Sequence, residues 1–220
     1  MTTHNVELEN SAWLSPRRPM DEDHRLGALH TRLASEAGAR GLLDVAYRTL
    51  ASPVGELLLA ATERGLVRVA YLNAGEGAGA DVASGRDAIL AELSRKVSPR
   101  VLAAPARLDR VARELEEYFS GERRSFDLAL DLRLTRGFRR EVVRRLPDIG
   151  FGATASYAQA AASAGSPRAV RAAGTACALN PLPIVLPCHR VVREGGGTGR
   201  HAGGPKAKRL LLDLEAGAAR

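Results

Sequence analysis

The chain is organised around the stretch Asn180-Pro181-Leu182-Pro183-Ile184-Val185-Leu186-Pro187-Cys188-His189-Arg190-Val191-Val192. Proline has no backbone N–H and restricts the residue before it, so these prolines exclude a helix and disfavour a central strand. We therefore expect a stiff, buried connector that places the thiol of Cys188 beside His189. A free thiol has a pKa of about 8.5 and reacts as the thiolate, which a neighbouring imidazole helps to form. The stretch predicts a nucleophilic cysteine.

Composition limits the partners and the compartment. The 220 residues carry a formal net charge of +7, which favours nucleic acid as a partner over a basic protein without one. No apolar run approaches the ~18 residues of a membrane span, and the polar start lacks a secretory signal. The two cysteines, Cys177 and Cys188, could bridge each other, but free thiols in a reducing cytoplasm are the simpler interpretation. We expect a cytoplasmic protein with no membrane partner, no metal and no cofactor.

Residues 45–130 predict a small N-terminal mixed α/β lobe, and residues 1–44 a poorly ordered arm with a short helix near 26–37. Turn residues and apolar spacing define the elements of the lobe. They are three strands of an antiparallel meander (45–50, 57–61, 66–72), a loop (73–85), two helices (89–97 and 108–118, the second closed by Gly121) and a strand (126–130).

Residues 131–217 predict a mainly helical lobe, which makes the chain an α+β protein. Its expected elements are an arginine-rich amphipathic helix (138–146), a helix-turn-helix (158–162 and 168–179) and a last helix (206–216). Ser166 suits the N-cap of the second helix of the pair, and Pro167 suits its first position.

The second helix of this pair consists largely of small residues, namely Ala169, Ala172, Ala173, Gly174, Thr175 and Ala176. Such a helix either packs tightly against a neighbour or lies close to a nucleic-acid groove, where Arg168 and Arg171 would reach phosphates or enter the duplex. We favour the second interpretation because basic residues crowd this half of the chain: Arg168, Arg171, Arg190, Arg193, Arg200, Lys206, Lys208 and Arg209.

Two features near the C-terminus allow more than one interpretation. The glycines between 195 and 204 permit tight turns and close approach to a ligand, but they match a phosphate-binding loop only weakly. Glu215 adjoins the apolar face of the last helix. A carboxylate in this position is most often a paired surface group, and here it could also orient His189.

At Pro187-Cys188-His189-Arg190-Val191 the sequence resembles the O6-alkylguanine-DNA alkyltransferases, the methylated-DNA–protein-cysteine methyltransferase family. The resemblance covers about residues 45–217. It implies that Cys188 accepts the alkyl group, that His189 and Glu215 relay its proton, and that Asn180 is the hinge asparagine of the site.

The same resemblance implies a DNA-binding set. Tyr157 would touch the substrate base, and Arg171 would replace that base in the duplex. The other residues expected at substrate or DNA belong to the thin helix and to the cysteine motif: Arg168, Ala172, Gly174, Arg190 and Val191.

The implied mechanism is stoichiometric repair of double-stranded DNA. The helix-turn-helix would lie in the minor groove, and O6-alkylguanine, with O4-alkylthymine as a second substrate, would rotate out of the duplex. The thiolate would take the alkyl group irreversibly, so one monomer would repair one lesion.

His201 departs from the family pattern, which usually has a tyrosine that helps to hold the guanine oxygen. Histidine can donate a hydrogen bond in the same way, but it titrates near neutrality. We expect His201 to contact the guanine and to impose a pH dependence on transfer.

Two other classes of protein are compatible with part of the pattern. A non-catalytic helix-turn-helix binder of alkylated DNA would recruit other repair factors, but Cys188 argues against it. A cysteine hydrolase would pair Cys188 with His189, yet sequence neighbours rarely point at each other, and it would not need a thin basic helix.

Overall fold

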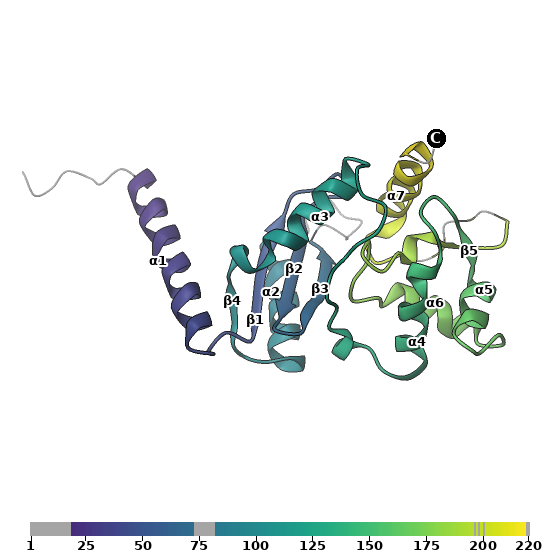
Figure 1. Cartoon of the computed structure of the whole chain (residues 1–220), viewed down its shortest axis with the longest axis horizontal. Coiled ribbons are helices and arrows are strands. Elements are labelled where there is room, and N and C mark those ends of the chain that lie inside the picture. The colour runs from purple at the N-terminus through teal and green to yellow at the C-terminus, as the bar shows by residue number, and fades with distance from the viewer. Residues whose placement is uncertain (1–18, 73–81, 196, 198, 200, 219–220) are drawn as a thin grey trace, which may run out of the picture.

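The structure is a computed structural model that describes residues 19–72, 82–195, 197, 199 and 201–218. Helix α1 (Pro19–Ala39) extends away from the rest of the chain and is longer than the short helix expected near 26–37 (Figure 1). The remainder of the predicted arm, residues 1–18, lies outside the described residues. No helix within the described ranges is long and apolar enough to cross a membrane.

The N-terminal lobe is built on a four-stranded sheet with the order β3-β2-β1-β4. The predicted meander is confirmed, because β1 (Val45–Leu50), β2 (Leu57–Thr62) and β3 (Gly65–Tyr71) pair antiparallel in sequence order. Strand β4 (Val101–Ala103), which was not predicted from the sequence, pairs parallel with β1. The sheet is therefore mixed and not purely antiparallel.

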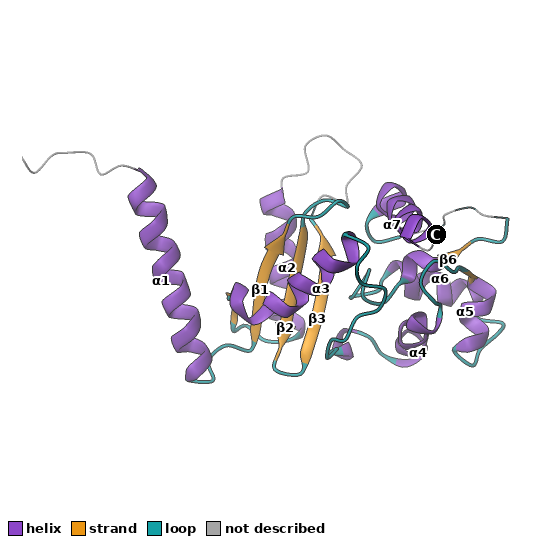
Figure 2. Cartoon of the chain, turned by 45° about the horizontal axis from the view of Figure 1, so that its top comes forward, coloured by secondary structure: helices purple, strands orange, loops and turns teal. Residues whose placement is uncertain are grey.

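Alternate residues of the strands face helices on opposite sides of the sheet. Leu57 and Leu59 share a hydrophobic cluster with Leu115 of α3 (Asp109–Phe119), whereas Leu58 packs with Leu93 of α2 (Val82–Lys96). Figures 1 and 2 show these helices on the two faces. This is the period of two that a strand imposes on its side chains.

The predicted helix end at Gly121 is confirmed. Gly121 has a φ of 83°, its N–H donates to Tyr118 O, and the N–H of Glu122 donates to Glu117 O. This hydrogen-bond pattern is the Schellman motif, which closes a helix with a left-handed residue. The loop predicted at 73–85 lies partly outside the described residues, and its residues 82–85 are helical.

The strand predicted at 126–130 is wrong. This extended segment forms a single bridge, between Leu130 and Leu66, and its side chains pack against the core. Gly65 permits the contact, because a Cβ at this glycine would lie 2.1 Å from the Ala129 carbonyl oxygen. The alternation of apolar residues thus came from packing and not from a strand ladder.

The C-terminal lobe is mainly helical, as predicted. It contains α4 (Gly137–Arg145), α5 (Tyr157–Ser163), α6 (Val170–Ala178), α7 (Gly204–Ala218) and a parallel pair of short strands, β5 (Ala155–Ser156) and β6 (Val191–Val192). The described residues also form short 3-10 turns: η1 (Pro105–Leu108), η2 (Leu132–Leu134), η3 (Leu146–Asp148) and η4 (Cys188–Arg190).

The helix-turn-helix starts differently from the prediction. Ser156 and Gln159 form a capping box that begins α5, a signal that the sequence analysis did not use. The second helix begins at Val170, so the prediction of Ser166 as N-cap and Pro167 as first helical residue is wrong. The Ser166 carbonyl instead accepts from the N–H of Ala169 in a separate turn.

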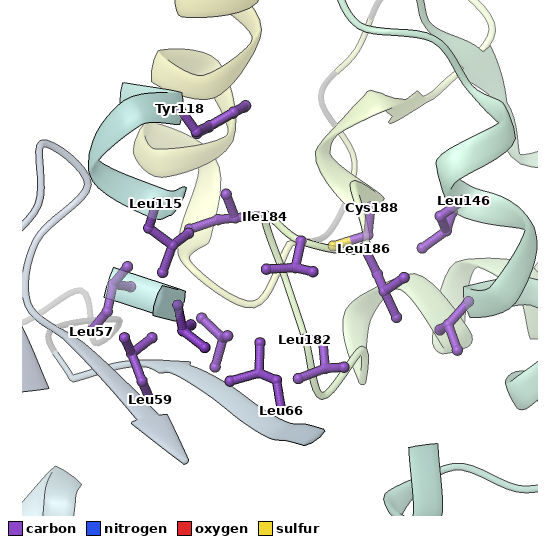
Figure 3. Packing of buried hydrophobic residues seen from close by; sticks show 14 of the residues in the cluster. Leu57, Leu59, Leu66, Leu115, Tyr118, Leu146, Leu182, Ile184, Leu186 and Cys188 are labelled. Atoms are coloured by element: carbon purple, nitrogen blue, oxygen red, sulfur yellow. The ribbon is translucent and has the colours of Figure 1, made fainter. Parts of the chain in front are cut away.

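The proline-rich connector is buried, as expected, and it contacts the sheet of the N-terminal lobe. The N–H of Val69 in β3 donates to Pro181 O, and Ile184 holds a φ of 74°, which is rare for a β-branched residue. Figure 3 shows Ile184 and Leu186 between the residues of α3 and Leu146. One hydrophobic cluster therefore includes strands, connector and C-terminal helices.

Candidate active site and DNA interface

Cys188 begins the 3-10 turn at the end of the connector and is only 1 % exposed. Burial raises the pKa of its thiol to about 11, while a hydrogen bond from Asn180 and the charge of Lys208 act in the opposite direction. Asn180 also fixes the connector, since its Nδ2 donates to Leu186 O and its Oδ1 accepts from the N–H of Leu182. The resting thiol is therefore protonated and needs a base before it can react.

His189 lies behind the cysteine, fully buried, with its Nε2 2.8 Å from Glu215 Oε1. Burial lowers the pKa of this imidazole, and Glu215 offsets part of the effect, so the ring is neutral near pH 7. An ionised carboxylate accepts only, which assigns the ring proton to Nε2. His189 Nδ1 is then a lone pair, and within the described ranges it has no hydrogen-bond partner.

Glu215 is the hub of the polar network. Burial disfavours its charge, but hydrogen bonds from His189 and Arg190 outweigh that effect and lower its pKa to about 2. The hydroxyl of Tyr118, on α3 of the N-terminal lobe, donates to Glu215 Oε1 at 2.7 Å, and the N–H of Gly152 donates to Oε2. Glu215 is therefore not a surface group: it is buried and contacts His189.

Arg190 does not have the role predicted for it. It is 5 % exposed, its Nε and Nη2 each lie 2.9 Å from a Glu215 oxygen, and its Nη1 donates to Ile149 O. Such a guanidinium is fully engaged inside the protein, so the assignment to substrate or DNA is wrong. Arg190 instead compensates the charge of Glu215.

Lys208 lies at the site, although its sequence position indicated only one more basic residue of this half of the chain. It is fully buried on α7, its Nζ donates to Val191 O at 2.5 Å, and it lies 5.9 Å from the ring centre of Tyr157. Burial lowers its pKa. Its spacing from Leu211 and Glu215 places all three on one helical face, which is the signal that would have found it.

The outer surface of the site is formed by α6 and by Tyr157. A pocket of about 510 Å³ is lined by Tyr157, Val170, Arg171, Gly174, Thr175, Ala178, Leu179, Arg193 and Gly199. Arg168, Arg171 and Ala172 are exposed, whereas Ala173 and Cys177 on the opposite face are buried. The small residues of α6 therefore pack inward on one face, as the packing interpretation predicts, and the other face stays exposed, as contact with a nucleic-acid groove would require.

His201 has a different electrostatic environment from the one expected. Burial lowers the pKa of its imidazole to about 3, and the charges of His189 and Lys208 add to the effect. Its Nδ1 accepts from the N–H of Gly203 at 3.1 Å, which assigns the ring proton to Nε2. The prediction that His201 titrates near neutrality is wrong, although the neutral ring can still donate.

A buried thiol with a histidine–glutamate pair, placed behind an open helix-turn-helix, defines a DNA-binding group-transfer protein. Two family models agree with this class. Residues 45–132 match the ribonuclease-like domain of 6-O-methylguanine DNA methyltransferase, and residues 137–217 match its DNA binding domain. The chain belongs to the 6-O-methylguanine DNA methyltransferase family.

Curated relatives and solved structures support the same family. A methylated-DNA–protein-cysteine methyltransferase of Methanosarcina barkeri is 36% identical over 169 residues, which cover 77% of this chain and 96% of that protein. The Mus musculus protein of the same name is 36% identical over 180 residues, with 77% and 80% coverage. The crystal structure of Mycobacterium tuberculosis OGT in complex with DNA is 33% identical, with a TM-score of 0.64 and coverage of 79% and 94%.

Proposed function

We propose that this protein repairs DNA by turning O6-alkylguanine, and also O4-alkylthymine, out of the duplex and moving the alkyl group irreversibly to Cys188. The observation that carries the proposal is Cys188 next to the neutral His189, which is itself held by Glu215. The presence of this thiol argues against a non-catalytic binder of alkylated DNA.

His189 is the base that activates the thiol. Its Nδ1 lone pair has no partner within the described part of the chain, and one bridging water would carry the proton from Cys188 to it. Glu215 then stabilises the imidazolium, because it is ionised and bonded to Nε2. Asn180 and Lys208 both favour the thiolate, which offsets part of the burial cost.

The transfer is a displacement at the alkyl carbon. A bond forms between Cys188 Sγ and the alkyl carbon, the bond from that carbon to the purine oxygen breaks, and its electron pair stays on the oxygen. The purine anion takes up a proton as it leaves. Tyr157, which lines the pocket, and His201, whose Nε2 has no hydrogen-bond partner among the described residues, would stabilise the developing charge. The thioether is stable, so each protein molecule acts once.

The exposed face of α6 is the proposed contact to the minor groove. Arg171 would fill the gap left by the extruded base, and Arg168 would meet a phosphate. Ala172 and Gly174 keep this face thin. We infer a monomer that acts in the cytoplasm, where the two free thiols, Cys177 and Cys188, stay reduced.

The decisive experiment uses a duplex with a labelled alkyl group on the guanine oxygen. The wild-type chain should take up one label per molecule, and Cys188→Ser should take up none while binding the duplex with unchanged affinity. Cys177→Ser is the matched control and should be labelled like wild type, because Cys177 is packed among the buried residues of α6. Label on Cys177, or on the Cys188→Ser variant, would refute the assignment of the nucleophile.

A further inference from the structure

Tyr71, the last residue of β3, brings the N-terminal lobe to the reaction centre. Its ring meets the His201 ring edge-on at 5.6 Å, and the His201 ring is in turn 6.5 Å from that of His189. A charge on Cys188 acts on the Tyr71 hydroxyl and, after burial, is the second cause of its raised pKa. Tyr71 therefore packs against His201, whose ring in turn lies next to that of His189.

The two glycines on either side of His201, Gly199 and Gly203, each lie close to a tyrosine ring. A Cβ at Gly203 would lie 2.6–2.8 Å from three carbons of the Tyr71 ring, and a Cβ at Gly199 would lie 2.4 Å from the Tyr157 hydroxyl. Only glycine allows the backbone to approach so closely. Tyr71 and Tyr157 thus contact the loop at two points, with His201 between them.

Two hydrogen-bond donors remain unused at this place. The Tyr71 hydroxyl and His201 Nε2 are both shielded from solvent, and neither has a partner within the described residues. His201 Nε2 carries the ring proton, because Nδ1 accepts from Gly203. A buried polar group without a partner is costly, so two of them on neighbouring rings indicate a ligand atom that accepts hydrogen bonds.

We propose that Tyr71 is a further substrate-contacting residue, whose hydroxyl, together with His201 Nε2–H, donates to the purine oxygen that loses the alkyl group. This inference rests on the proposed alkyl transfer. An anionic purine oxygen can accept two hydrogen bonds, and its charge grows only as the bond to carbon breaks. Both donors therefore act on the transition state more than on the bound substrate.

Tyr71 donates a hydrogen bond and keeps its proton. Burial and the nearby Cys188 charge raise the pKa of the phenol well above its ordinary value, so the hydroxyl stays a donor throughout the working pH range. The proton that neutralises the purine anion comes from elsewhere. The effect of Tyr71 on the transfer rate should consequently be independent of pH.

The test is Tyr71→Phe, which keeps the ring against Gly203 and removes only the hydroxyl. Tyr47→Phe is the matched control, since Tyr47 lies on β1 and packs with the cluster on the α2 side of the sheet. We expect single-turnover transfer to fall at least about ten-fold in Tyr71→Phe, with His201 retaining part of the effect. Tyr47→Phe should stay within about two-fold of wild type.

Two readouts separate this contact from a structural role. The loss should be equal on duplex O6-methylguanine and on free O6-benzylguanine, and it should not change between pH 6 and 9, while DNA affinity and urea unfolding match those of the control. If wild type transfers the label and Tyr71→Phe keeps its rate, the inference is wrong and the proposed function stands. If wild type transfers nothing to Cys188, both are wrong.

Discussion

At the scale of single residues, the site depends on charges that are buried in pairs. Glu215 is 1 % exposed and contacts Arg190, His189 and Tyr118. Removing one partner of a buried ion pair lowers stability more than replacing both partners by apolar residues, because the remaining charge stays buried without compensation. The effect of replacing Glu215 should therefore appear first in stability.

Glu215→Gln should lower the free energy of unfolding by about 3–5 kcal/mol at pH 7, since Arg190 then keeps an unpaired buried charge. The pH dependence should change as well. The pKa of Glu215 falls from 4.5 to about 2 on folding, so its contribution is complete above pH 4.5 and is lost as the pH falls toward 2. Urea unfolding at a series of pH values should show a flatter acid limb in this variant.

The control for Glu215→Gln is Glu116→Gln, at an exposed position of the same residue type on α3. It should leave both the stability and its acid limb unchanged. An equal acid limb in wild type and Glu215→Gln would show that Glu215 is not held ionised by its partners.

The stability of the protein should also depend on pH through His201, whose imidazole is charged when protonated, whereas the carboxyl group of Glu215 is charged when deprotonated. Its pKa falls from 6.5 to about 3 on folding, so the unfolded chain binds the proton first, and stability is lost as the pH falls from about 6.5 toward 3. His201→Tyr should lose less stability across this range, although His189 keeps part of the slope.

The transfer rate of His201→Tyr should have the same acid limb as wild type above about pH 5, because the wild-type imidazole is already neutral there. Unfolding and single-turnover rates measured on the same two proteins separate these effects. A rate limb near pH 6.5 that disappears in His201→Tyr would show that this imidazole titrates in the reacting protein.

The residues that the sequence identified are those that carry a local signal. Cys188, His189 and Asn180 belong to one motif, and the structure brings Glu215 to them from α7. Tyr71, Tyr118 and Lys208 reach the same centre from β3, α3 and α7, and no motif marks them. Arg190 was misassigned because a positive charge in the sequence does not say whether its partner is internal or external.

At the scale of elements, α6 is the proposed contact to DNA. Arg171→Ala should slow transfer from duplex DNA at least about ten-fold and leave transfer from free O6-benzylguanine unchanged, because holding the duplex open matters only when there is a duplex. Single-turnover rates on both substrates give the comparison. This pattern differs from that expected for Tyr71→Phe, which should lose equally on both substrates.

Arg168→Ala is the control for Arg171→Ala. A phosphate contact should weaken binding to every duplex and reduce the slope of log K against log salt by about 0.9, with little effect once the protein is saturated. A loss on the free base in Arg171→Ala would instead make Arg171 a packing residue.

Elements with a strong repeating pattern were predicted and short ones were not. The meander, α3 with its glycine ending, and α4 follow from period and turn residues. Strand β4 has three residues, too few to show a period, and it exists because β1 offers a parallel edge. Ser166 and Pro167 are residue types that often begin a helix. In the structure they belong to a separate turn that precedes α6.

At the scale of the whole molecule, one hydrophobic cluster joins the two lobes. The connector contributes Leu182, Ile184 and Leu186 to a cluster that also contains strand and helix residues of both lobes (Figure 3). Tyr118 and Tyr71 extend the N-terminal lobe into the site. We therefore expect the site to lose its structure together with the sheet.

Leu182→Ala tests whether the site and the sheet unfold together, because Leu182 is fully buried in the connector. It should lower the free energy of unfolding by about 2–5 kcal/mol, through lost burial and the cavity left behind.

In a Cys177→Ser background the only thiol is Cys188, so its exposure to a thiol reagent reports on the site, and far-ultraviolet circular dichroism reports on both lobes. Both probes should follow one transition in urea, and Leu182→Ala should move them together. Leu42→Ala, at a side chain that is 53% exposed, should move neither. If the thiol became accessible at a lower urea concentration than the loss of the dichroism signal, the connector would be a separate unit, and Tyr71 would not be held at the reaction centre by the fold as a whole.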